Sequence, residues 1–190
     1  MLARLPILTL AVALALVAGG CGGGGDEESS EPEGTPPRQW VTSVCGALDG
    51  WQTSLEDKAQ NLPQEVLQSA SPTAAKQRIG DFLGEVIGET DAMIARVDKA
   101  GRPAVDEGRR IAADVHTRLL KVKAAFEAAR ERVEKVPTND PLAFQSELTE
   151  IGQDLLAQGQ SLGDILRRAD AKPIQDALQE DERCAAFTGT

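Results

Sequence analysis

The chain has 190 residues, of which 41% are hydrophobic and only 3% aromatic, with no tyrosine. That length allows one domain with a substantial core, which has to be built from Leu, Val, Ile and Ala and therefore favours helices over strands. The 30 acidic and 20 basic residues give a net charge of −10, which argues against nucleic acid as a partner and against a polybasic contact with lipid.

The first twenty residues have the pattern of a signal peptide. Arg4 supplies a positive charge, residues 5–17 are almost entirely apolar, and small residues follow up to Gly20. The apolar run of ~13 residues is shorter than the ~20 that a membrane-spanning helix needs. We therefore predict that residues 1–20 are a cleaved export signal and not a permanent anchor.

The signal ends in Val17, Ala18, Gly19 and Gly20, followed by Cys21. This stretch resembles the lipobox of bacterial lipoproteins, and the resemblance extends no further along the chain. It implies that a diacylglyceryl group is attached to Cys21, that the chain is cut just before it, and that the protein stays on the extracytoplasmic face of the cell membrane. The alternative is an ordinary signal-peptidase cut that leaves the thiol of Cys21 free.

Residues 21–38 are predicted to be the lipidated cysteine and a flexible, acidic tether. Four glycines follow Cys21, and the residues after them are polar, acidic and rich in proline. Such a segment cannot bury enough apolar surface to order itself. As a random coil it spans on the order of 20 Å, which separates the domain formed by residues 39–190 from the lipid headgroups.

Apolar residues recur at helical spacing throughout the folded part, which predicts four long helices. The first begins near Pro36 and Pro37, with Thr35 as its cap, and ends at Pro63. Its apolar stripe consists of Trp40, Val44, Leu48, Trp51, Leu55 and Leu62. The two tryptophans are predicted core residues, with a role in binding as the alternative.

The second helix starts at Ser71 and Pro72, a capping residue followed by a first-turn proline, and stops at Gly101. Its stripe consists of Ile79, Phe82, Leu83, Val86, Ile87, Met93, Ile94 and Val97. The third helix starts at Pro103 and ends at Pro137. Its stripe consists of Val105, Ile111, Val115, Leu119, Val122, Phe126, Ala129, Val133 and Val136.

The fourth helix starts at Asp140, and a short acidic segment follows Pro173, where Ile174 and Leu178 are predicted to dock on the bundle. The stripe of the fourth helix consists of Phe144, Leu148, Ile151, Leu155, Leu162, Ile165 and Leu166. Matched lengths and short connections favour antiparallel neighbours. The predicted fold is therefore all-α, an antiparallel up-down four-helix bundle with a short C-terminal helical segment.

Lipidation of Cys21 leaves Cys45 and Cys184 as the remaining cysteines. In an exported domain they have one possible pairing, and an oxidising compartment permits the bond. The up-down topology also brings the end of the fourth helix beside the start of the first. The predicted disulfide closes a long loop and contributes ~4–5 kcal/mol in the chain-entropy model. The alternative is that the two cysteines form a metal-binding or redox pair. The sequence argues against it, because no histidine lies near either cysteine and there is no Cys-x-x-Cys motif.

Motifs for catalysis or metal binding are missing from the sequence. His116 is the only histidine, and we predict that it lies at the edge of the third helix's apolar stripe. One histidine cannot build a di-metal bundle site, and neither a nucleophile elbow nor a P-loop is present. We therefore expect no enzyme activity, no cofactor and no metal.

Gly80, Gly84 and Gly88 recur every four residues on the second helix. Glycines inside a helix cost ~1 kcal/mol each relative to alanine, so some contact should compensate for them. We predict close packing against a neighbouring helix, with a groove for a partner helix or an apolar ligand as the alternative.

The basic residues of the third helix are interleaved with glutamates, which is typical of a solvated, salt-bridged face. They are Lys121, Lys123, Arg130, Arg132 and Lys135.

By exclusion, the sequence favours a lipid-anchored, extracytoplasmic helical module that works through contacts with another protein of the cell envelope. No motif identifies that partner. The alternative is a carrier of an apolar small molecule or lipid in the bundle core.

Overall fold

The structure is a computed structural model that describes residues 33–169 and 171–188. The signal peptide, Cys21 and most of the predicted tether lie outside this part of the chain. Leu162 and Ile165, which were expected on the fourth apolar stripe, have side chains that lie outside the described ones.

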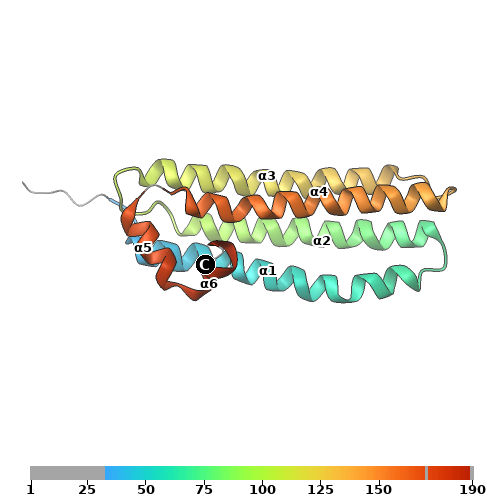
Figure 1. Ribbon diagram of the computed structural model, residues 1–190, viewed down its shortest axis with the longest axis horizontal. Helices are drawn as coiled ribbons and strands as arrows, with labels where there is room; N and C mark the ends of the chain where they lie inside the picture. Colours follow the sequence, from blue (N-terminus) through green and yellow to red (C-terminus); the bar gives the residue numbers. More distant parts are fainter. Residues whose placement is uncertain (1–32, 170, 189–190) are drawn as a thin grey trace, which may run out of the picture. The chain divides into compact units, whose positions relative to one another are not determined.

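The described residues form four long helices and two short ones. The long helices are α1 (Pro37–Leu67), α2 (Pro72–Lys99), α3 (Gly108–Lys135) and α4 (Pro141–Arg167). The short helices are α5 (Lys172–Glu180) and α6 (Glu182–Thr188). Consecutive long helices run antiparallel and pack side by side, which confirms the predicted up-down bundle (Figure 1).

Two helices begin where a capping residue in the sequence predicts a helix start. The Ser71 hydroxyl accepts a hydrogen bond from the Ala74 N–H at 3.2 Å and caps α2. The Asp140 carboxylate accepts bonds from the N–H groups of Leu142 and Ala143 at 3.0 and 3.1 Å and caps α4. These side chains satisfy N–H groups that have no partner within the helix.

The predicted end of the first helix at Pro63 is wrong, because α1 continues through this proline to Leu67. Proline has no N–H to bond the carbonyl of Ala59. Both residues are exposed, so water can satisfy that carbonyl and the break is tolerated. Thr35 is not the cap either, since the residue before α1 is Pro36, which makes no side-chain bond.

The predicted start of the third helix at Pro103 is also wrong, since α3 begins at Gly108. The Val105 N–H donates to the Pro103 carbonyl, and the Gly108 N–H donates to the Val105 carbonyl, both at 2.9 Å. These bonds form tight turns between Pro103 and Gly108. Pro103 is buried and pairs with Thr35 instead of opening a helix.

The core consists of two hydrophobic clusters along the bundle. The first lies at the end that carries α5 and α6, and it includes Trp40, Trp51, Met93, Leu119, Leu166 and Ile174. The second lies toward the opposite end and includes Ala75, Leu83, Ala129, Val133, Phe144 and Ile151. Both tryptophans are buried, as predicted.

The two short helices hold α1 and α4 together at one end. Helix α5 packs against α1, and α6 packs against both α1 and α4, whereas the described parts of α1 and α4 have no comparable contact with each other. Ile174 and Leu178 of α5 are buried, which confirms their predicted docking. Helix α6 therefore bridges the first and fourth helices (Figure 1).

Candidate functional site

Residues 33–36 and Trp40 contact residues 100–104 where the chain enters the bundle, and we call these contacts the entry clasp. The Thr35 N–H donates to the Arg102 carbonyl and the Ala104 N–H donates to the Thr35 carbonyl, both at 2.8 Å. The Thr35 hydroxyl donates to the Ala100 carbonyl at 2.6 Å. The indole N–H of Trp40 donates to the Gly101 carbonyl at 2.9 Å. The end of the predicted tether is therefore fixed to the α2–α3 connection.

Glycine is required at position 34 of the entry clasp. Its φ angle of +152° is one that side-chain-bearing residues rarely adopt, and a Cβ there would lie 2.6 Å from the Arg102 carbonyl oxygen. The Arg102 guanidinium also pairs with the Glu33 carboxylate at 2.7 Å. Because Glu33 is largely exposed, this ion pair adds little to stability.

The predicted disulfide between Cys45 and Cys184 is present and joins α1 to α6. The two Cα atoms are 5.3 Å apart across a sequence separation of 139 residues, and both side chains are fully buried. The bond thus connects the beginning and the end of the folded part. Its burial keeps it away from reductants in solvent.

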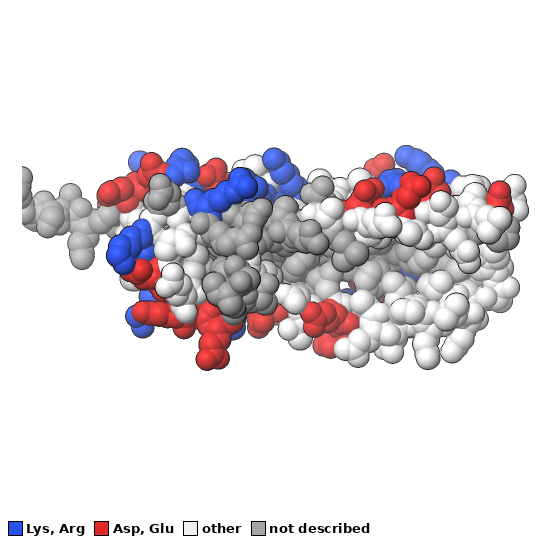
Figure 2. Space-filling model, viewed as in Figure 1, with Lys and Arg blue, Asp and Glu red and all other residues white. Residues whose placement is uncertain are grey.

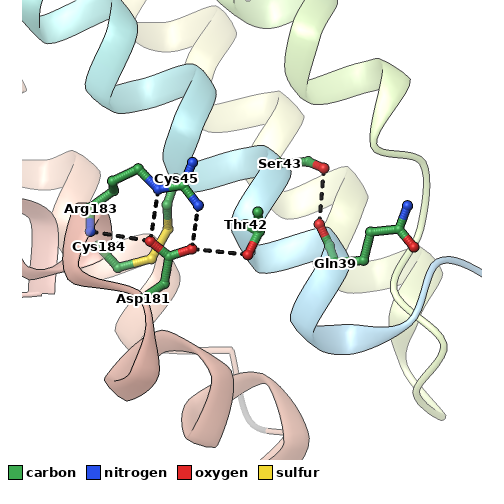
Figure 3. A network of polar contacts seen from close by, with 7 residues as sticks. All are labelled: Gln39, Thr42, Ser43, Cys45, Asp181, Arg183 and Cys184. Carbon is green, nitrogen blue, oxygen red and sulfur yellow. Dashed lines mark hydrogen bonds and ion pairs between the residues drawn. A yellow bond between two sulfur atoms is a disulfide. The ribbon is translucent and has the colours of Figure 1, made fainter.

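A polar cluster lies beside the disulfide (Figure 3). Arg183 donates to the Asp181 carboxylate from Nε at 3.0 Å, from Nη2 at 2.7 Å and from its backbone N–H at 3.1 Å. The Thr42 hydroxyl of α1 donates to the same carboxylate at 3.0 Å. The bonds from Arg183 and then Thr42 hold the pKa of Asp181 below its usual value, although burial acts in the opposite direction. The carboxylate is therefore a poor base.

Gly46 makes room for this cluster on α1. A Cβ at that position would lie 3.0 Å from Nη1 of Arg183, closer than ordinary van der Waals contact. The absence of a side chain lets the guanidinium lie against the helix while it holds Asp181. The cluster therefore joins the C-terminal segment to α1 beside the disulfide.

A surface hollow of about 510 Å³ adjoins the cluster. It is lined by Arg38, Thr42, Ala177, Glu180, Asp181, Glu182 and Arg183. Four of its charged residues are paired with one another, Arg38 with Glu180 and Arg183 with Asp181. The side chains of its lining supply a hydroxyl, carboxylates and guanidinium groups.

His116 lies away from this hollow, on α3, where Nδ1 is 2.7 Å from Oδ1 of Asp98 on α2. Its side chain is partly exposed, as predicted for a residue at the edge of the apolar stripe. Within the described ranges, no group of three or more His, Cys, Asp or Glu side chains is arranged to hold a metal ion.

The predicted close packing of the glycines on α2 is wrong for Gly80 and Gly88. A Cβ at either position would meet no described atom within 4 Å. At Gly84 it would meet the Arg130 guanidinium of α3 at an ordinary contact distance of 3.6 Å. Lys123, Arg130, Arg132 and Lys135 of α3 do form ion pairs, as predicted for a salt-bridged face.

Sequence reasoning did not predict the polar cluster or the entry clasp. The cluster had a weak local signal, because Asp181 and Arg183 lie within three positions of Cys184. The clasp had none, since its bonds join Thr35 and Trp40 to a turn more than 60 positions away.

No helix in the part of the chain that the structure describes is long and apolar enough to cross a membrane. No protein-family model matches the chain, and no curated protein or solved structure shows detectable similarity to it.

Proposed function

We propose that this protein is a lipid-anchored, extracytoplasmic helical module that acts through contacts with another protein of the cell envelope and has no catalytic role. The lipid is attached to Cys21, at the start of the predicted tether. The folded part is a helical bundle whose first helix is joined to its last by the disulfide between Cys45 and Cys184.

The buried disulfide is the observation that carries this proposal. Disulfides form and persist in oxidising compartments, so a bond between Cys45 and Cys184 supports export of the folded part. The signal pattern that ends at Cys21 supports the same location independently.

The polar cluster supports a structural rather than a catalytic role for the conspicuous charged residues. Asp181 is held by Arg183 and Thr42, and its lowered pKa disfavours proton abstraction at neutral pH. An activity that His116→Ala abolished without unfolding the domain would contradict the non-catalytic part of the proposal.

Metabolic labelling with an alkyne fatty acid tests the anchor. The wild-type chain should be labelled and found with the membrane, whereas Cys21→Ser should lose both properties. The double variant Cys45→Ser/Cys184→Ser is the matched control, because it removes cysteines without touching Cys21 and should keep the label. Equal labelling of the wild type and Cys21→Ser would overturn the anchor.

A further inference from the structure

The buried side chains of α1 all lie in its first half. They are those of Trp40, Val41, Val44, Cys45, Ala47, Leu48 and Trp51. In residues 52–67, which we call the α1 arm, no side chain is buried, and Leu55, Leu62 and Val66 are partly buried. Helices α2 and α3, by contrast, have buried side chains in both halves. The first half of α1 therefore makes all the fully buried contacts of this helix with the core.

The first half of α1 is also fixed to the rest of the bundle at several points. The indole of Trp40 belongs to the entry clasp, and Cys45 forms the disulfide with α6. The Trp51 indole N–H donates to the hydroxyl of Thr90 on α2 at 3.1 Å. Trp51 is the last residue of α1 that is both buried and hydrogen-bonded to another helix. This set of contacts therefore ends where the α1 arm begins.

The contacts of the α1 arm with other helices are weaker. Within the described residues, its hydrogen bonds and ion pairs to other helices come from Lys58 alone, which pairs with Glu85 at 2.9 Å and with Glu89 at 3.9 Å. All three side chains are partly exposed to solvent, so these ion pairs contribute little to stability. Figure 2 shows few charged side chains at this end of the bundle, opposite α5 and α6, on the face drawn. Apolar contact is therefore the main attachment of the arm.

This apolar contact is itself incomplete. A hollow of about 140 Å³ lies between the arm and α2 and is lined in part by Leu62 and Phe82. Pro63 lies in the same stretch of α1, and it has no N–H to bond the Ala59 carbonyl. The arm therefore combines a loosely packed face with a missing hydrogen bond of its own helix.

We propose that the α1 arm is a lid that opens locally, detaching from α2 and unwinding while the first half of α1 and the other long helices stay folded. Isolated helices shorter than ~12–15 residues are marginal in water, and Pro63 divides the arm into shorter stretches. An arm that leaves α2 should therefore lose its helical hydrogen bonds. Opening exposes Phe82 of α2, beside Leu62, and one side of the second core cluster, against which Val66 packs. The opening does not depend on a lipid at Cys21.

Hydrogen exchange of the full-length chain in detergent tests the opening. Amides of the arm should exchange faster than those of residues 123–135 of α3 by about tenfold or more, because local opening costs less than unfolding of the bundle. Residues 123–135 are the matched comparison, since they lie at the same end of the bundle but include the buried side chains of Ala129 and Val133. Equal protection of the two segments would overturn the proposal.

Pro63→Ala tests whether this exchange reflects unwinding of the arm. Alanine restores an N–H that can bond the Ala59 carbonyl, so the arm amides should exchange more slowly than in the wild type by about tenfold or more. Pro72→Ala is the control, because Pro72 is the first residue of α2, where an N–H has no partner within the helix. Unchanged exchange of the arm in Pro63→Ala would contradict the proposal.

Ile111→Val separates local opening from unfolding of the whole bundle. Ile111 is buried on α3 in the first core cluster, and its shortening should speed the exchange of residues 123–135 by about threefold or more. Exchange of the arm should stay unchanged, because Ile111 is packed in the closed and in the open state alike. Faster exchange of both segments by the same factor would show that the arm opens only when the bundle unfolds, and the proposal would then be wrong.

Discussion

Thr90 shows how one polar side chain is accommodated in the core of the bundle. It is fully buried, and its hydroxyl accepts a bond from the Trp51 indole N–H at 3.1 Å while it donates to the Val86 carbonyl at 2.8 Å. The hydroxyl thus satisfies the only polar atom of the Trp51 side chain. A buried indole without such a partner would carry a desolvation cost.

Replacing Thr90 with valine should therefore destabilise the protein despite conserving its shape. Thr90→Val leaves the Trp51 N–H without a partner and should lower the free energy of unfolding by about 1–3 kcal/mol. Denaturant unfolding followed by circular dichroism measures the change. Thr90→Ser is the control, because it keeps the hydroxyl and loses only a methyl group. A valine variant as stable as the wild type would contradict this account.

Asp181 should make stability depend on pH in the acidic range. Its pKa is lower in the folded chain than in the unfolded chain, mainly because of Arg183. The resulting stabilisation is complete above the ordinary carboxyl pKa of about 4 and is lost as the pH falls through the folded value. Asp181→Asn should lower the unfolding midpoint at about pH 7 and reduce its further fall on acidification.

Asp176→Asn is the control for this pH dependence. Asp176 also pairs with a cation, Lys172, but this pair is exposed and belongs to α5 alone. The unfolding midpoints of the wild type and both variants are measured across the acidic range. They distinguish the contributions that the two carboxylates make to the pH dependence of stability. Equal pH profiles for the wild type and Asp181→Asn would show that the polar cluster does not couple to folding.

At the scale of elements, the apolar stripes predicted the helices better than single residues predicted their ends. Ser71 and Asp140 act as caps because their side chains bond N–H groups of the same turn. The predictions from Pro63 and Pro103 were wrong because the effect of a proline on a helix depends on its surroundings. Pro63 lies in an exposed turn near the end of α1, and Pro103 is paired with Thr35.

The glycines of α2 lead to a prediction about helix stability. Gly80→Ala and Gly88→Ala should each raise the free energy of unfolding by about 0.5–1 kcal/mol, because a methyl group meets nothing nearby and restricts the unfolded chain. Thermal unfolding of each variant measures this. Gly34→Ala in the entry clasp is the opposite case and should destabilise, because its Cβ would meet the Arg102 carbonyl. A loss of stability at Gly80 would restore the packing role predicted from the sequence.

At the scale of the whole molecule, stripe periodicity and cysteine number predicted the bundle and its disulfide. Cys45 and Cys184 could be paired because the topology and the cysteine count pointed to the same contact. The bridge made by α6 between α1 and α4 could not be predicted, because it depends on how a seven-residue helix fits between two longer ones. The entry clasp was equally inaccessible, since Thr35 bonds backbone groups that carry no side-chain signature.

The disulfide should stabilise one end of the bundle more than the other. Cys45→Ser/Cys184→Ser removes the link between α1 and α6 and should lower the free energy of unfolding by ~2–4 kcal/mol. The four long helices should still form, because both core clusters keep their remaining apolar residues. The short helices α5 and α6 bury few apolar residues, so their attachment to the bundle depends on the disulfide.

Hydrogen exchange resolves where that loss of stability falls. In the double variant, amides of α5 and α6 should exchange faster, because these helices can detach without unfolding the rest of the bundle. Amides of α2 and α3 around Leu83 and Val133 belong to the second cluster and should keep most of their protection. Before the exchange experiment, mass spectrometry should confirm the disulfide. The intact mass of the non-reduced wild type should be lower than that of its reduced form by the mass of two hydrogen atoms. Uniform loss of protection along the chain would mean that the bundle unfolds as one unit and that the disulfide stabilises both of its ends alike.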